Sequence, residues 1–117
     1  MSPVTPQQVE QRLYQLSKEV DDAQTALAEA ETTYTDVKAR YEISLARERL
    51  RIRRDPVKFT VQDVTDMALL ACEVLHLELA AAEAVVKAAR GNANRVRTQV
   101  DIARSIGTSV RSSWDVS

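Results

Sequence analysis

Apolar residues follow a heptad pattern in the first half of the chain. From Val9 they recur in alternating steps of four and three, at positions 9, 13, 16, 20, 23, 27, 30, 34, 37 and 41. This spacing places one apolar stripe along an α-helix and is typical of a coiled coil. After Tyr41 the stripe is expected to shift to Leu45 and then Leu50. The pattern predicts one helix over about residues 6–54.

A second stripe of the same kind follows and predicts a second long helix. Its members are Val61, Val64, Ala68, Ala71, Leu75, Leu79, Ala82, Val86, Ala89, Ala93, Val96, Val100, Ala103, Ile106 and Val110. The stripe takes one extra four-residue step, from Leu75 to Leu79, and then resumes its spacing. Gly91 could end a helix, but the stripe keeps its phase there. The pattern favours one helix over about 61–111, weak or broken near Gly91, and a frayed tail at 112–117.

Both predicted helices begin with a capping sequence. Thr5 precedes Pro6, and Gln8 can bond back to the cap, while Thr60 occupies the equivalent place in the second half. Pro56 disfavours helical geometry before it and so ends the first helix, which leaves a short turn at about 55–60. A short connection forces neighbouring helices to run antiparallel. The predicted fold is therefore all-α, a long antiparallel, coiled-coil-like helical hairpin formed by residues 1–117 as one domain.

Composition agrees with long helices and adds a prediction of self-association. The chain has two Gly, three Pro, 4% aromatic residues and one cysteine, which cannot form an internal disulfide. The window from Met67 to Val86 is apolar around most of the helix, so one partner helix cannot cover it. We predict a homo-oligomer whose interface includes Leu69, Leu70, Leu77 and Val85. No signal peptide or membrane span is recognised, and a cytoplasmic location is predicted.

The net charge of −1 conceals four blocks of alternating sign. Residues 1–37 carry two basic and seven acidic groups, and 38–58 carry eight basic and three acidic groups. Residues 59–83 carry five acidic and no basic groups, and 84–117 carry six basic and two acidic groups. Folding the chain back at Pro56 places blocks of opposite sign side by side. The charge pattern thus favours the same hairpin and predicts that most basic residues face acidic ones within the chain.

Six basic residues near the predicted turn are harder to pair in this way, because they surround the helix. This basic cluster comprises Arg47, Arg49, Arg51, Arg53, Arg54 and Lys58. Guanidinium groups suit phosphate oxygens, and without aromatic residues nearby any nucleic-acid binding would be independent of sequence. A second basic group on the second helix comprises Lys87, Arg90, Arg95 and Arg97. Both groups are candidate nucleic-acid contacts, and a groove that joined them would have to form between subunits.

Catalytic and metal signals are weak. Glu73 and His76 match the Glu-x-x-His element of helical di-iron proteins, and Cys72 lies one turn before His76. Glu73 is predicted to point away from the apolar stripe, however, and the lone His and Cys lack the further partners that a metal or nucleophilic site needs. We predict no metal, no cofactor and no enzymatic activity.

Three segments resemble the UvsY-type recombination mediators of tailed phages. They are Val37–Glu42, Val85–Gly91 and Val100–Ile106, and their order and separation are also similar. The resemblance implies a ring-like homo-oligomer that binds single-stranded DNA and helps load a recombinase onto strands coated by a single-strand-binding protein. It also implies that Lys87, Arg90, Arg95 and Arg97 contact DNA, and that the cytoplasm is that of the bacterial host.

Two functions are therefore expected. The first is a non-enzymatic recombination accessory protein of phage type that self-associates and binds single-stranded DNA and a recombinase. The alternative is a coiled-coil interaction or assembly protein, such as a phage structural protein or adaptor, whose arginines form salt bridges only. The basic cluster favours the first function, and the complementary charge blocks favour the second.

Overall fold

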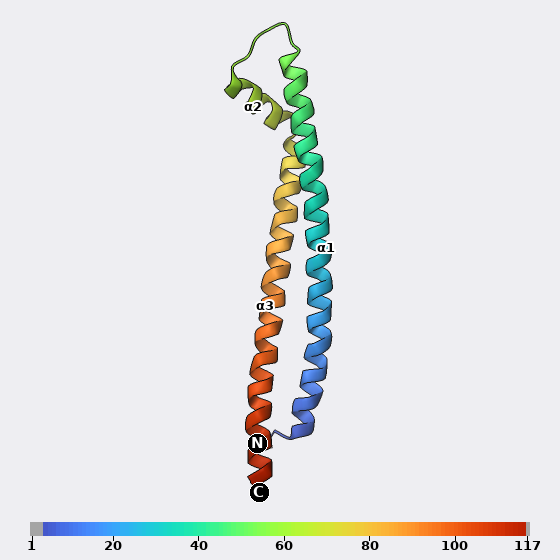
Figure 1. The fold of residues 1–117 in the computed structure, drawn as a ribbon, viewed down its shortest axis with the longest axis vertical. Helices are drawn as coiled ribbons and strands as arrows, with labels where there is room; N and C mark the ends of the chain where they lie inside the picture. Colours follow the sequence, from blue (N-terminus) through green and yellow to red (C-terminus); the bar gives the residue numbers. More distant parts are fainter. Residues whose placement is uncertain (1–3, 117) are drawn as a thin grey trace. The chain divides into compact units, whose positions relative to one another are not determined.

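The computed structural model describes residues 4–116, which form three helices. These are α1 (Pro6–Arg53), α2 (Val61–Ala71) and α3 (Glu73–Val116) (Figure 1). Their contacts divide the chain into two compact units. The terminal unit comprises Met1–Ala28 and Ala88–Ser117, and the central unit comprises Glu29–Lys87. The all-α class predicted from the sequence is confirmed.

The caps of α1 and α2 form as their sequences predict. The Gln8 backbone N–H donates to Thr5 Oγ1 at 3.2 Å, and the Thr5 N–H donates to Gln8 Oε1 at 3.0 Å. These reciprocal bonds satisfy two backbone groups that the first turn of a helix leaves without partners. Thr60 caps α2, because its Oγ1 accepts the Asp63 N–H at 3.1 Å. Capping therefore fixes where both helices start.

The terminal unit is an antiparallel pair made by the start of α1 and the end of α3. Ala23 packs with Ala93 and Val96, whereas Val9, two heptads earlier in α1, lies against Gly107, two heptads later in α3. Gly107 is buried, and a Cβ added to it would lie 2.9 Å from Val9 Cγ1. The backbones approach each other closely at this point because Gly107 has no side chain.

The central unit contains the end of α1, all of α2 and the start of α3. Ile52 is 3% exposed and packs with Val64 and Ala68 of α2, and Leu45 lies against this cluster. Figure 1 shows α2 turned out of line with the start of α3, and Val64 and Ala68 of α2 contact Ile52 near the end of α1. Within this unit too, α1 and α3 run antiparallel, as the hairpin prediction requires.

The heptad stripe of α1 is confirmed up to Tyr41. One half of its positions is buried (Val9, Leu16, Ala23, Ala30, Val37), and the other half is partly buried (Leu13, Val20, Leu27, Tyr34, Tyr41). The predicted shift to Leu45 is also present. The prediction that the stripe continues at Leu50 is wrong, however, because Leu50 is 52% exposed and Ile52 is buried instead. Ile52 follows Leu45 by seven residues, so the stripe resumes the heptad spacing after one shift.

The second predicted helix is interrupted, and the interruption is at Cys72 rather than Gly91. Cys72 has φ −104° and ψ 22°, and its N–H still bonds to Ala68 at 3.1 Å. α3 then runs through Gly91 without a break. The buried stripe passes from Ala68 to Cys72 and then to Leu75, so the extra four-residue step lies at this junction and not between Leu75 and Leu79. The change of direction between α2 and α3 accommodates the shift in the spacing of the buried stripe.

Three further positions of the second stripe were assigned wrongly. Val61, Ala71 and Ile106 are exposed, and Cys72 and Gly107 occupy the buried places of the last two. The helical end was also placed too early, since α3 continues to Val116 where fraying was expected from residue 112. Residue 117 lies outside the described residues. The remaining positions from Leu75 to Ala103 are buried or partly buried, as predicted.

Candidate interaction surfaces

The ion pairs recorded in the described part of the central unit all lie within single helices. Among the described residues 29–87, the ion pairs join Arg40 to Asp36 and Arg51 to Glu48 in α1, and Lys87 to Glu83 in α3. All three join residues three or four positions apart on a single helix and are at least partly exposed, and such pairs contribute only tenths of a kcal/mol, roughly, to stability. The carboxylates of α2 are therefore not used to neutralise the arginines at the end of α1.

The basic cluster lies wholly in the central unit, at the last turns of α1 and in the connection to α2. Arg51 pairs with Glu48 at 2.7 Å, but the structure records no ion pair for the other five members within the described residues. All six are exposed or partly exposed. Arg47 also lines a groove of about 270 Å³ with Cys72 and Val74. The cluster is an exposed cationic surface with most of its charge uncompensated by direct contact.

The second basic group is not one surface. Lys87 belongs to the central unit and pairs with Glu83 at 3.5 Å. Arg90, Arg95 and Arg97 belong to the terminal unit. Arg95 donates to Asn92 Oδ1 at 2.8 Å and lines a groove of about 340 Å³ whose other wall includes Glu19 and Asp22. The carboxylates beside Arg95 disfavour an approaching phosphate, which weakens its assignment as a nucleic-acid contact.

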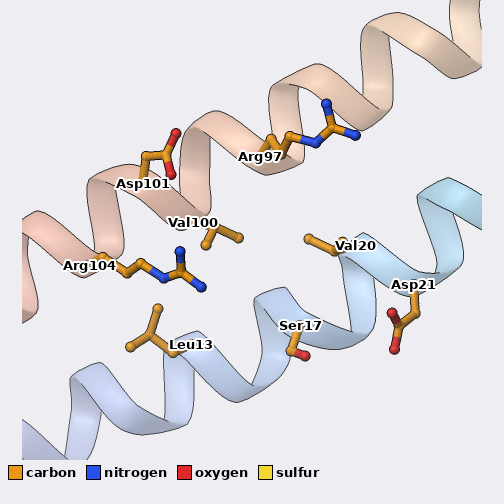
Figure 2. A pocket seen from close by; sticks show the side chains of 8 residues that line it. All are labelled: Leu13, Ser17, Val20, Asp21, Arg97, Val100, Asp101 and Arg104. Atoms are coloured by element: carbon orange, nitrogen blue, oxygen red, sulfur yellow. The ribbon is translucent and has the colours of Figure 1, made fainter.

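Arg97 lines a larger groove of about 490 Å³ between α1 and α3 of the terminal unit (Figure 2). Leu13, Val20 and Val100 point into the gap between the helices, and the guanidinium of Arg104 reaches in from α3. From the sequence, Arg104 was counted in the basic block 84–117 but was not named as a candidate nucleic-acid contact. Its spacing of one heptad from Arg97, which places both on the same side of α3, was a signal that could have found it.

Large apolar side chains are exposed throughout the central unit. The predicted interface residues Leu69, Leu70, Leu77 and Val85 are all exposed. Leu77 and Val85 belong to a stripe on the side of α3 opposite its buried residues. This α3 face comprises Val74, Leu77, Ala81 and Ala84, at heptad steps of three, four and three, together with Val85 four residues after Ala81, and all five are exposed. One helix of the central unit therefore has two apolar sides, of which the chain covers only one.

An equivalent outer stripe runs along α1 in the same unit. This α1 face comprises Ala39, Ile43, Ala46 and Leu50, at steps of four, three and four residues, all exposed. Ile43 and Leu50 are each more than half exposed. Leu50, which the sequence analysis predicted to be buried, is therefore exposed as part of a second regular apolar pattern on α1.

The residues considered for metal binding have structural roles. His76 Nδ1 lies 3.2 Å from the Tyr41 hydroxyl, and their rings lie 5.6 Å apart, which links α3 to α1. Cys72 is a buried free thiol at the α2–α3 junction, and Glu73 is exposed. Between residues 4 and 116 no group of three or more His, Cys, Asp and Glu side chains is arranged to hold a metal ion.

Two further observations bear on function. None of the helices in the described part of the chain is both long and apolar enough to cross a membrane. Comparisons with protein-family models, with curated proteins and with solved structures found no match to this chain. The surfaces themselves are therefore the basis for a functional proposal.

Proposed function

We propose that this chain is a non-enzymatic assembly protein that associates with copies of itself through the central unit. The observation that supports the proposal is the exposure of regular apolar stripes on two helices of one unit. Exposed apolar residues scattered singly are normal in a monomer, whereas a continuous seam at heptad spacing is typical of helices that pack against another helix. Covering such a seam removes apolar area from water, and that removal drives association.

The expected result is a mass greater than one chain. Sedimentation equilibrium at micromolar concentration measures the mass directly, and a second run after tenfold dilution tests for reversible dissociation. We expect Leu77→Glu to lower the mass, because a carboxylate cannot be buried in an apolar seam without a large desolvation cost. Ile102→Glu, at an exposed position of the terminal unit, is the matched control and should leave the mass unchanged. A wild-type mass of one chain would contradict self-association.

A second candidate function is sequence-independent binding of single-stranded nucleic acid, as in a recombination accessory protein. It is favoured by one observation, the lack of carboxylate partners for most of the basic cluster. Guanidinium groups that already pair with carboxylates would have to give up those contacts to bind phosphate. Here Arg53, Arg54 and Lys58 have none to give up among residues 4–116. The recombinase and single-strand-binding partners remain predictions that rest on the family resemblance.

Fluorescence anisotropy with a labelled single-stranded oligonucleotide tests this second candidate. We expect binding at low salt that weakens steeply as salt increases, because binding releases counterions from the phosphates. Charge reversal of Arg53 and Arg54 should weaken binding and lower the salt slope by about 0.7 for each phosphate that the protein no longer neutralises. Reversal of Lys18 and Arg111 changes the net charge equally in the terminal unit and is the control. If the oligomeric protein does not bind at low salt, this candidate is wrong.

A further inference from the structure

The two uncovered faces of the central unit carry opposite charge. The segment of α1 that bears the α1 face, residues 38–53, contains six basic and two acidic residues, and Arg54 follows it directly. The segment of α3 that bears the α3 face, residues 73–85, contains three acidic residues and no Lys or Arg. Arg47, Arg53 and Arg54 flank the α1 face, whereas Glu73 and Glu78 flank the α3 face, as their helical spacing requires.

These opposite charges do not neutralise one another by contact within one chain. The recorded ion pairs of residues 29–87 join neighbours on the same helix, and Glu73 and Glu78 take part in none of them. Both faces therefore present an apolar seam with flanking charges that are available to another helix. In paired helices, flanking charges of opposite sign select the partner, and flanking charges of like sign reject it.

We propose that the α1 face of one copy packs on the α3 face of a second copy. The inference rests on the proposed self-association and adds which surfaces meet. It accounts for both uncovered faces with one kind of contact, in which Ile43 and Leu50 meet Val74, Leu77 and Val85 of the neighbouring copy. Alanines on both faces let the helix backbones approach closely. Glu73 and Glu78 then lie beside the arginines of the neighbour.

Pairing each face with its own copy is less favourable. Two α1 faces would bring arginines against arginines, and two α3 faces would bring glutamates against glutamates. An interface between unlike faces also has a consequence for size. After one contact forms, each copy still has one free face, so the assembly continues until it closes into a ring or extends as a filament. The protein is then expected to form assemblies of more than two copies.

Two variants that each disable one face test this arrangement. Ile43→Lys places a charge in the α1 face, and Leu77→Glu places one in the α3 face. Both side chains are more than half exposed, so folding of the single chain should be retained, and circular dichroism checks this. Ile102→Lys is the control in the terminal unit. Sedimentation measures the masses. Association of the two variants is tested by whether one variant, carrying a tag, retains the other, untagged variant, at the concentration used for wild type.

The expected results are monomers for each variant alone and a dimer for their equimolar mixture. In the mixture, the intact α1 face of Leu77→Glu meets the intact α3 face of Ile43→Lys, which forms one interface. If Ile43→Lys keeps the wild-type mass, or if the mixture does not associate while wild type assembles, the unlike-face arrangement is wrong but self-association stands. If wild type is itself a monomer, both the arrangement and the proposed function are wrong.

Discussion

Replacing Ile52 by Ala is expected to lower the free energy of unfolding by about 2–5 kcal/mol. Ile52 is nearly inaccessible to solvent and is the α1 residue in the cluster that holds Val64 and Ala68 of α2. Truncation removes buried methyl groups and leaves a cavity, and the surrounding helix pair can close it only in part. Urea unfolding followed by circular dichroism, at one fixed protein concentration, measures the effect.

Ile102→Ala is the matched control for this experiment. It removes the same atoms from a side chain that is 54% exposed, so the expected loss of stability is well under that of Ile52→Ala. Equal losses of stability for the two variants would show that Ile52 does not anchor α2. Protection of the α2 amides from hydrogen exchange offers a second measure. In Ile52→Ala we expect the protection of the α2 amides to fall more than the protection of amides in the terminal unit, because the weakened packing belongs to the central unit.

Replacing Gly107 by Val is expected to destabilise the terminal unit by about 1–3 kcal/mol. The added Cβ would lie 2.9 Å from Val9 Cγ1, closer than two carbon atoms normally approach. Valine is also stiff about χ1 in a helix, so it cannot turn away from the neighbouring helix. The two helices must therefore separate at this point, which weakens the packing around Val9.

Gly91→Val is the matched control, because nothing lies within 4 Å of a Cβ placed there. Valine has a slightly higher helix propensity than glycine, so Gly91→Val should be neutral or stabilising by a few tenths of a kcal/mol, roughly. Thermal unfolding of both variants beside wild type measures the difference. Similar melting temperatures for the two variants would mean that the helices are not in close contact at Gly107.

The sequence predicts the parts of the fold that depend on local chemistry. Thr5 and Thr60 cap their helices as expected, because capping needs only residues within one turn. The stripe from Val9 to Tyr41 is buried as predicted, because a regular heptad in a long helix leaves one choice of side. Antiparallel pairing was predicted from the short turn after Pro56, and the structure has it between α1 and α3, although α2 lies between them in the chain. These predictions needed no knowledge of distant contacts.

The interruption at Cys72 could not be predicted in the same way. No glycine or proline marks it, and the residues around Cys72 are compatible with a continuous helix. The interruption lets Val64 and Ala68 of α2 pack on Ile52 of α1, which lies where the α1 stripe has shifted. That is a contact between segments distant in sequence. The same shift explains why Leu50 was taken for a core residue when it belongs to the outer face.

The candidate surfaces were predicted only in part. Leu70 and Leu77 were identified as exposed because one helix cannot cover an apolar window on all sides. The α1 face was missed, since Ile43 stands between the polar residues Glu42 and Ser44 and carries no signal of its own until the buried side of α1 is known. The basic cluster is exposed in the central unit, but the α1 face ends within it. Packing of a second copy there would compete with nucleic acid for Arg53 and Arg54.

Because the recorded ion pairs lie within single helices, they bear on which substitutions the sequence can accept. Inside each unit, apolar side chains and the small residues opposite them decide how the helices align, while the recorded charged contacts stay on one helix. Substitutions can therefore alter the sign and density of surface charge without shifting one helix along the other. The packing of the helices and the charge of their exposed surface are in this sense separable.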